Sequence, residues 1–67
     1  MSGVDEAIKV AGGVSSLARR VGVSPPAVSQ WKRDGFVPSR KGRARTVHEA
    51  TGVPLHRLNP TDFPKEV

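Results

Sequence analysis

Apolar residues recur along this chain every three or four positions, the spacing of an amphipathic helix. The first such run predicts a helix over residues 3–11. Its inward positions are Val4, Ala7, Ile8 and Ala11. Ser2 precedes Asp5 by three residues, as in a capping box in which Asp takes the place of Glu. Two glycines follow the run, so we expect the first helix to end there.

The next two runs predict a pair of short helices, over residues 14–21 and 25–33, joined by a tight turn. Their inward positions are Leu17, Ala18, Val21, Val28 and Trp31. Gly22 suits the turn because glycine accepts positive φ without a Cβ penalty. Ser24 can cap the second helix of the pair through its hydroxyl. Pro25 suits the first helical position, whose N–H has no partner within the helix.

The second half of the chain predicts two more helices, over residues 40–51 and 54–58, and an extended tail over residues 59–67. Ser39 can cap the first of them, although Gly42 disfavours its first turn by about 1 kcal/mol relative to Ala. No segment alternates apolar and polar residues as a strand would, and the proline spacing argues against paired strands. We therefore expect an all-α fold, a compact bundle of about five short helices.

The helix pair over residues 14–33 resembles the helix-turn-helix of the Cro/CI-like phage repressors. The resemblance is carried by Ala18, by Gly22 in the turn and by the apolar residues at the spacing of the motif: Leu17, Val21, Val23, Val28 and Trp31. The flanking stretches GGVSSLAR, SQWKRDG and ATGVP fit the same family. The resemblance implies a lambda repressor-like DNA-binding domain in a small Cro-like regulator of prophage or antitoxin type. It also implies a cytoplasmic, nucleoid-associated protein of a bacterial or phage-infected cell.

Composition narrows the possible functions. The chain has 67 residues, which indicates a single domain spanning residues 1–67, with 11 Lys and Arg against 6 Asp and Glu and a net charge of +5. This charge favours a polyanionic partner. The absence of Cys excludes disulfides and thiolate metal sites. His48 and His56 form no credible metal set, and no catalytic triad or phosphate loop is evident, so we expect neither an enzyme nor a cofactor. No apolar run has the length of a membrane span.

Six of the basic residues lie within residues 32–45, directly after the expected reading helix. That helix, over residues 25–33, should enter the major groove of a double-stranded DNA operator. The expected base-contacting residues are Pro25, Pro26, Ser29, Gln30 and Arg33. The expected backbone-contacting residues are Ser15, Ser16, Arg19, Lys32, Arg40, Lys41 and Arg43. The family resemblance places base contacts at Pro25, Pro26 and Gln30.

Some of these positions have two interpretations. The prolines cannot donate a hydrogen bond, so they either meet a thymine methyl group or only stiffen the start of the helix. Capping explains at least one of Ser15 and Ser16 as well as phosphate binding does. Trp31 is expected in the core rather than as a base-stacking platform.

An alternative function is a protein-interaction module, such as the antitoxin of a toxin–antitoxin pair that also binds its own promoter. Leu55, Leu58 and Phe63 could contact a second copy of the chain or a toxin or other protein partner, or they could close the monomer core. We expect a homodimer on DNA and no association with a membrane.

Overall fold

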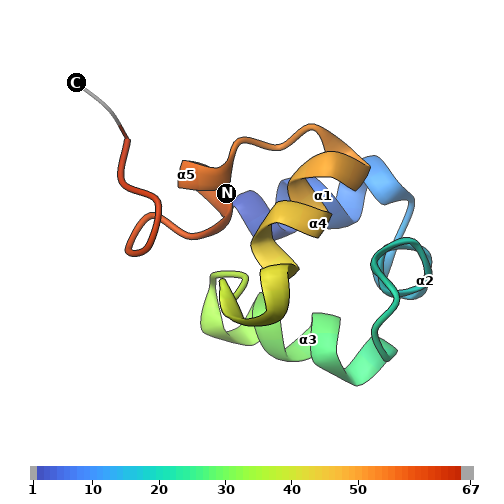
Figure 1. The fold of residues 1–67 in the computed structure, drawn as a ribbon. Coiled ribbons are helices and arrows are strands. Elements are labelled where there is room, and N and C mark those ends of the chain that lie inside the picture. Colours follow the sequence, from blue (N-terminus) through green and yellow to red (C-terminus); the bar gives the residue numbers. More distant parts are fainter. Residues whose placement is uncertain (1, 66–67) are drawn as a thin grey trace.

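Helices make up all the regular structure in residues 2–65, which are the residues described by the computed structural model (Figure 1). Five α-helices and one 3₁₀ segment follow in order: α1 (Gly3–Ala11), α2 (Val14–Val21), α3 (Pro25–Asp34), η1 (Arg40–Gly42), α4 (Arg43–Thr51) and α5 (Leu55–Leu58). The prediction of an all-α bundle of five short helices is confirmed. None of the helices in the described residues has the length and apolar character needed to cross a membrane.

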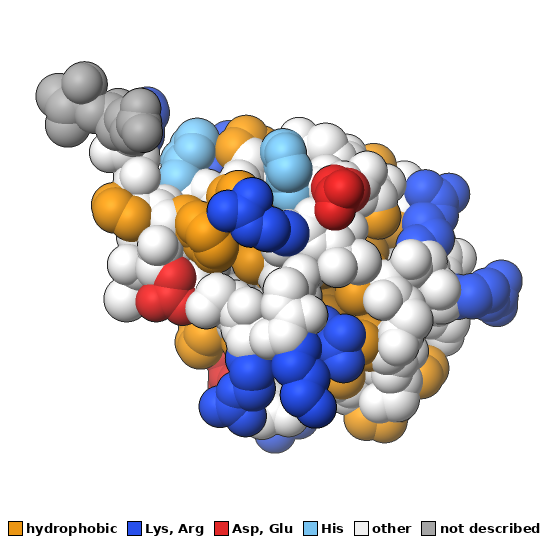
Figure 2. Space-filling model, viewed as in Figure 1, with side chains coloured by type: hydrophobic (Ala, Val, Ile, Leu, Met, Phe, Trp, Pro, Cys, Tyr) orange, Lys and Arg blue, Asp and Glu red, His pale blue; other side chains and the backbone are white. Residues whose placement is uncertain are grey.

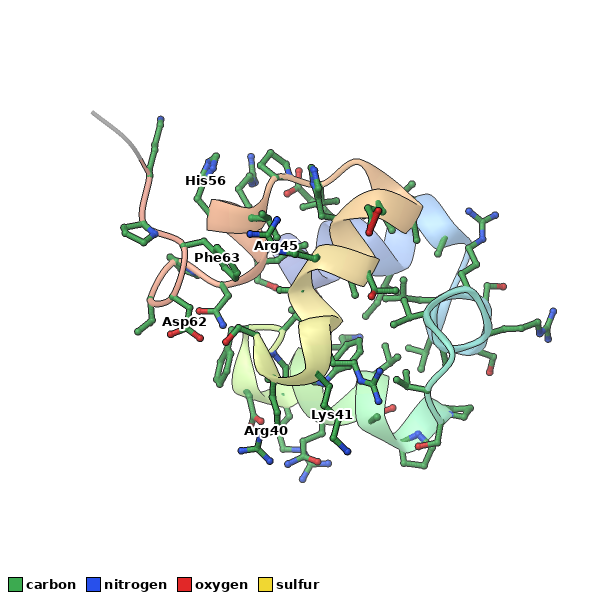
Figure 3. All side chains as sticks on the ribbon, viewed as in Figure 1. Arg40, Lys41, Arg45, His56, Asp62 and Phe63 are labelled. Atoms are coloured by element: carbon green, nitrogen blue, oxygen red, sulfur yellow. The ribbon has the colours of Figure 1, made fainter. Side chains whose placement is uncertain are left out.

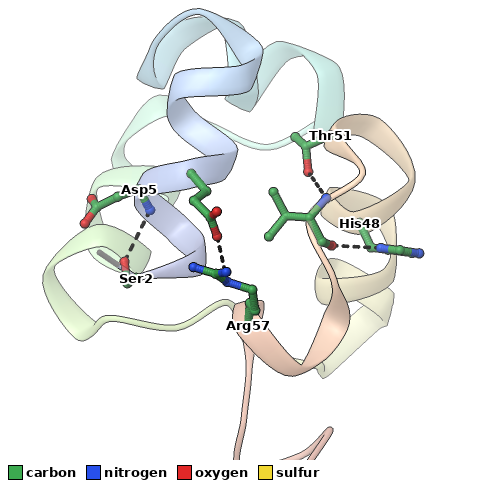
Figure 4. Close-up of polar contacts among 7 residues, drawn as sticks. Ser2, Asp5, His48, Thr51 and Arg57 are labelled. Carbon is green, nitrogen blue, oxygen red and sulfur yellow. Dashed lines mark hydrogen bonds and ion pairs between the residues drawn. The ribbon is translucent and has the colours of Figure 1, made fainter. Parts of the chain in front are cut away.

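Residues at its two ends determine where α1 begins and ends. The backbone N–H of Asp5 donates to the Ser2 hydroxyl over 3.2 Å, which caps the start of α1 (Figure 4). Asp5 and Glu6 lie in the first turn, where the helix dipole favours negative charge. At the other end Gly12 adopts φ 93°, and its N–H donates to the carbonyl of Ile8. The helix therefore begins and ends at residues whose chemistry suits those positions.

Every α-helix contributes to one hydrophobic core. Its buried members are Val4, Ala7, Ala11, Leu17, Ala18, Val21, Val28, Trp31, Val37, Ala44, Val47, Val53 and Leu58. Trp31 is only 6% exposed, so it is a core residue as expected. Leu58 is fully buried, so it closes the monomer core and cannot contact a second copy of the chain. Leu55 and Phe63 pack against the core and stay partly exposed.

The predicted helix over residues 40–51 is wrong at its start. Lys41 has φ 56° and Gly42 has φ 71°, so the chain is left-handed at both and the 3₁₀ turn η1 is separated from α4. The predicted cap is also wrong, because the Ser39 hydroxyl donates to Asp62 and accepts no hydrogen bond from a helix N–H.

Ser24 likewise makes no side-chain cap on α3. A cap side chain accepts from the N–H of the second or third helical residue, and Pro26 at the second position has no N–H. The next N–H, that of Ala27, donates to the backbone carbonyl of Ser24 over 3.0 Å.

The C-terminal segment is not simply extended. Residues 60–63 fold into a turn in which the N–H of Phe63 donates to the carbonyl of Asn59 over 2.9 Å. Asn59 is 2% exposed and is the one buried polar side chain in the described part of the chain. Residues 1, 66 and 67, which belong to the expected domain and tail ranges, lie outside the described residues.

Candidate nucleic-acid interface

The pair α2–α3 is joined by a tight turn at Gly22. Gly22 adopts φ 82°, and its N–H donates to the carbonyl of Ala18 over 2.9 Å. The N–H of Val23 donates to the same carbonyl over 3.0 Å. Leu17, Ala18 and Val28 are buried beneath the pair, so the opposite face of α3 is left to solvent.

The outward face of α3 carries the five residues expected to meet bases. Pro25, Pro26, Ser29, Gln30 and Arg33 are all exposed. The two prolines occupy the first two helical positions, where they stiffen the start of α3 and leave it without N–H donors. The polar groups that this face offers to a ligand are therefore concentrated at Ser29, Gln30 and Arg33.

A groove of about 520 Å³ runs between α3 and the four residues Arg40–Arg43, which we call the basic segment. Gln30 lines one side of the groove, and Arg40, Lys41 and Arg43 line the other. Figure 2 shows Lys and Arg side chains gathered at the lower edge of the molecule in this view. In Figure 3 Arg40 and Lys41 project from that edge, beside α3. The fold thus brings a candidate base-reading side chain and three cations to one concave surface.

The groove also contains residues that were not expected at the site. Phe36 is 42% exposed and lines the groove together with the more buried Trp31. Asp34 is an acidic group among the lining residues. An exposed aromatic ring beside cations suits a partner with both apolar and anionic parts, such as the sugar–phosphate backbone of DNA. The sequence signal for Phe36 was weak, because a single aromatic residue after a helix more often joins the core.

The remaining candidates lie outside this groove. Arg19, Lys32 and Ser15 are exposed, and Ser16 is half-buried. Gly13 occupies the cap position of α2, so neither serine caps that helix. The capping interpretation of these serines is therefore wrong, and a phosphate contact stays a prediction.

The C-terminal residues form a separate surface. A second depression, of about 670 Å³, is lined by Leu55, His56, Asp62, Phe63, Pro64 and Lys65. The guanidinium carbon of Arg45 lies 5.9 Å from the centre of the Phe63 ring, a cation–π contact. Figure 3 shows Phe63 between Arg45 and Asp62, with His56 nearby on α5. Of the three residues that could contact a second copy or close the core, Leu58 is buried and Leu55 and Phe63 are partly exposed, so contact through these two stays a prediction.

His48 has a structural role. Its Nδ1 lies 2.8 Å from the carbonyl oxygen of Val53, and the Thr51 hydroxyl accepts the N–H of Val53 over 3.2 Å (Figure 4). These bonds hold the turn between α4 and α5. Within residues 2–65, no three His, Asp or Glu side chains gather as metal ligands would.

Comparison with known proteins gives a consistent result. A family model described as bacterial toxin YdaS matches residues 4–60. The Cro protein from the putative prophage element Xfaso 1 of Xylella fastidiosa strain Ann-1 is 34% identical, with 97% of this chain and 100% of that chain covered and a TM-score of 0.86. XPH1, a hybrid sequence of Xfaso 1 and Pfl 6, is 40% identical, with 78% of this chain and 77% of that chain covered and a TM-score of 0.64. No curated protein matches the chain.

These similarities confirm the Cro-like resemblance that the helix pair predicted. Neither the family nor the solved structures are described as enzymes, which agrees with the expectation that this chain is not one.

Proposed function

The chain belongs to the bacterial toxin YdaS family, and we propose that it is a Cro-like regulator that binds double-stranded DNA. The observation that carries the proposal is the groove in which Gln30 of α3 faces Arg40, Lys41 and Arg43. The net charge of +5 supports it, since DNA attracts cationic proteins over long distances. The similarity to a solved Cro protein over nearly the whole chain supports it independently.

In this proposal α3 lies in the major groove with its N-terminal half toward the bases. Gln30 can form paired hydrogen bonds with adenine, and Arg33 can do so with guanine. Pro25 and Pro26 supply apolar contact only, for example with a thymine methyl group. The basic segment lies along the phosphates, together with Lys32 and with Ser15, Ser16 and Arg19 of α2. Phosphate contacts supply affinity and register, whereas the contacts from α3 supply sequence preference.

The first prediction separates these two roles. An operator is first selected from a random duplex pool with the wild-type chain. Gln30→Ala should weaken binding to that operator by about 1–3 kcal/mol and relax the preference at one base position, because a base contact is lost. Arg40→Ala should weaken binding to operator and random DNA alike, because a phosphate contact is lost. The slope of log affinity against log salt concentration should become less steep by about 1.

The control is Arg20→Ala, which removes an exposed arginine of α2 that lies outside the groove. It should keep the selected sequence and change affinity less than Arg40→Ala does. If Gln30→Ala lowers operator and random affinities equally while Arg40→Ala changes the selected sequence, α3 is not the reading helix.

We further propose that two copies bind one operator, with half-sites about 34 Å apart on one face of the duplex. One copy offers a small contact, so pairing is the usual way for such a domain to gain affinity. Leu55 and Phe63 are the proposed contact between copies, because they are apolar and partly exposed. The same selection tests this pairing. A two-fold symmetric consensus is expected, and one copy bound to an asymmetric site would contradict it.

A second candidate function is the inhibition of bacterial growth, with or without a protein partner. It is favoured by the description of the family as a bacterial toxin and by the depression beside α5, which offers a place for a protein. Induced expression of the wild-type chain in a bacterial host tests it. Growth inhibition that Gln30→Ala and Arg40→Ala abolish would act through DNA. Inhibition that both variants retain would indicate a protein target.

A further inference from the structure

A polar network ties the C-terminal turn to the loop that precedes the basic segment. The side-chain nitrogen of Asn59 donates to the carbonyl of Val37 over 2.9 Å, and its side-chain oxygen accepts the N–H of Asp62 over 3.0 Å. The N–H of Val37 in turn donates to the carbonyl of Leu58 over 2.8 Å. Residues 58–62 and the loop at Val37 are thus bonded to each other although they lie far apart in the sequence.

The carboxylate of Asp62 extends this network to the residue next to the basic segment. Its Oδ2 accepts a hydrogen bond from the Ser39 hydroxyl over 2.7 Å and a second from the Asn59 side chain over 3.2 Å. Ser39 directly precedes Arg40, at the start of η1. Asp62 therefore links the buried Asn59 to Ser39, the residue directly before the basic segment.

The basic segment needs such an anchor. Ser39, Arg40, Lys41 and Gly42 are all exposed, and the nearest fully buried residues on either side are Val37 and Ala44. Exposed backbone loses conformational entropy when it is held in one shape, and burial offsets little of that loss here. Lys41 is also held at φ 56°, a conformation that persists only where the surroundings impose it.

We infer that Asp62 is a positioning residue for DNA binding: it holds Ser39, and through Ser39 it sets the place of the basic segment beside α3. The inference rests on the proposed function. It also explains why an acidic group stands next to cations that face a polyanion. The charge of Asp62 opposes DNA binding, whereas its hydrogen bonds favour it. The two effects therefore have opposite signs and can be separated by substitution.

Four variants separate the effect of the Asp62 hydrogen bonds from the effect of its charge. Ser39→Ala removes the hydrogen bond and keeps the charge, and Asp62→Ala removes both. Asp62→Asn removes only the charge, since both bonds converge on one oxygen that an amide oxygen can replace. Thr61→Ala is the control, because Thr61 is the exposed neighbour of Asp62 in the same turn.

Affinity is measured for each variant on the selected operator and on random duplex DNA. The operator-to-random ratio should fall about three- to tenfold in Ser39→Ala and Asp62→Ala, the change expected from one net hydrogen bond. Random-DNA affinity depends on the number of charges rather than on a fixed shape of the basic segment, so it should stay constant in Ser39→Ala and rise in both Asp62 variants. The operator complex also needs the phosphate contacts in register with α3, so only its affinity depends on how firmly the segment is held. Asp62→Asn and Thr61→Ala should keep the ratio. A purely structural role would lower the melting temperature of Ser39→Ala and leave the ratio unchanged.

Backbone order parameters from NMR relaxation give a readout that needs no DNA. Those of residues 40–43 should fall in Ser39→Ala and Asp62→Ala and stay at wild-type values in the other two variants. The inference about Asp62 is wrong if the wild-type chain binds DNA but Ser39→Ala and Asp62→Ala leave the affinity ratio and the order parameters unchanged. That outcome leaves the proposed function standing. A wild-type chain that binds no duplex DNA overturns the proposed function, and the role of Asp62 in DNA binding with it.

Discussion

At the scale of single residues, Gly3 shows how closely α1 packs against α5. A Cβ atom on Gly3 would lie 2.1 Å from the carbonyl oxygen of Arg57, so only glycine fits where α1 passes the backbone of α5. The start of α1 indeed lies beside α5 in Figure 1. An ion pair at the same contact joins Arg57 Nε to Glu6 Oε2 over 2.8 Å (Figure 4). Both side chains are partly exposed, so the pair adds little to stability and close backbone packing dominates.

Gly3→Ala should therefore destabilise the fold by about 1–3 kcal/mol through overpacking, although Ala is the better helix former by about 1 kcal/mol. Val10→Ala is the control, because Val10 lies on the same helix and is 56% exposed. Urea denaturation should show a lower midpoint for Gly3→Ala and a near wild-type midpoint for Val10→Ala. Equal stability of Gly3→Ala and the wild type would mean that α1 and α5 are not in close contact.

At the scale of elements, the left-handed backbone at Lys41 and Gly42 separates η1 from α4 within the basic segment. Lys41 is the one residue other than glycine with a positive φ among the described residues. The left-handed conformation costs a residue with a Cβ roughly 1–2 kcal/mol, whereas glycine adopts it readily. The structure therefore accepts strain at a lysine that lines the groove, where its charge serves the proposed contact with phosphate.

Lys41→Gly should relieve this strain and raise the free energy of unfolding by up to about 1 kcal/mol. Arg40→Gly is the matched control, since it removes the same charge at a neighbouring exposed position without a positive φ. Both should weaken DNA binding. The prediction fails if chemical denaturation shows that Lys41→Gly is no more stable than Arg40→Gly.

At the scale of the whole molecule, one small core supports both the groove beside α3 and the C-terminal depression. A domain of 67 residues buries a modest fraction of its surface, and a core of that size rarely supplies more than about 3–5 kcal/mol of stability. Trp31 is the largest residue of that core, and it lies under the groove as well as under the helix pair. The integrity of the interface therefore depends on the integrity of the core.

Trp31→Ala should cost about 3–5 kcal/mol, enough to unfold most of the protein at room temperature. Phe36→Ala is the aromatic control, because Phe36 is 42% exposed and its removal should change stability by no more than about 0.5 kcal/mol. Thermal melting followed by circular dichroism compares them. A Trp31→Ala variant with a near wild-type melting temperature would contradict the assignment of Trp31 to the core.

The fold class and the first three helices were predictable because they rest on local signals. Helical periodicity identifies the buried faces, and Gly12, Gly22 and Gly35 end α1, α2 and α3 at positive φ. The outward face of α3 followed from the same periodicity, which places Gln30 and Arg33 opposite the core. The start of α4 did not follow, because the pattern of apolar residues cannot show that Lys41 adopts a left-handed conformation.

The sequence alone thus determined an all-helical domain, its helix-turn-helix and the cationic character of the segment after α3, all of which depend on residues close together in the chain. Only the tertiary structure decided which distant residues meet. In the folded chain Gln30 and the basic segment line the same groove, Leu58 is buried, and Asp62 accepts a hydrogen bond from Ser39. These contacts depend on how the helices pack, because burial and hydrogen bonding are properties of the whole core rather than of any single segment.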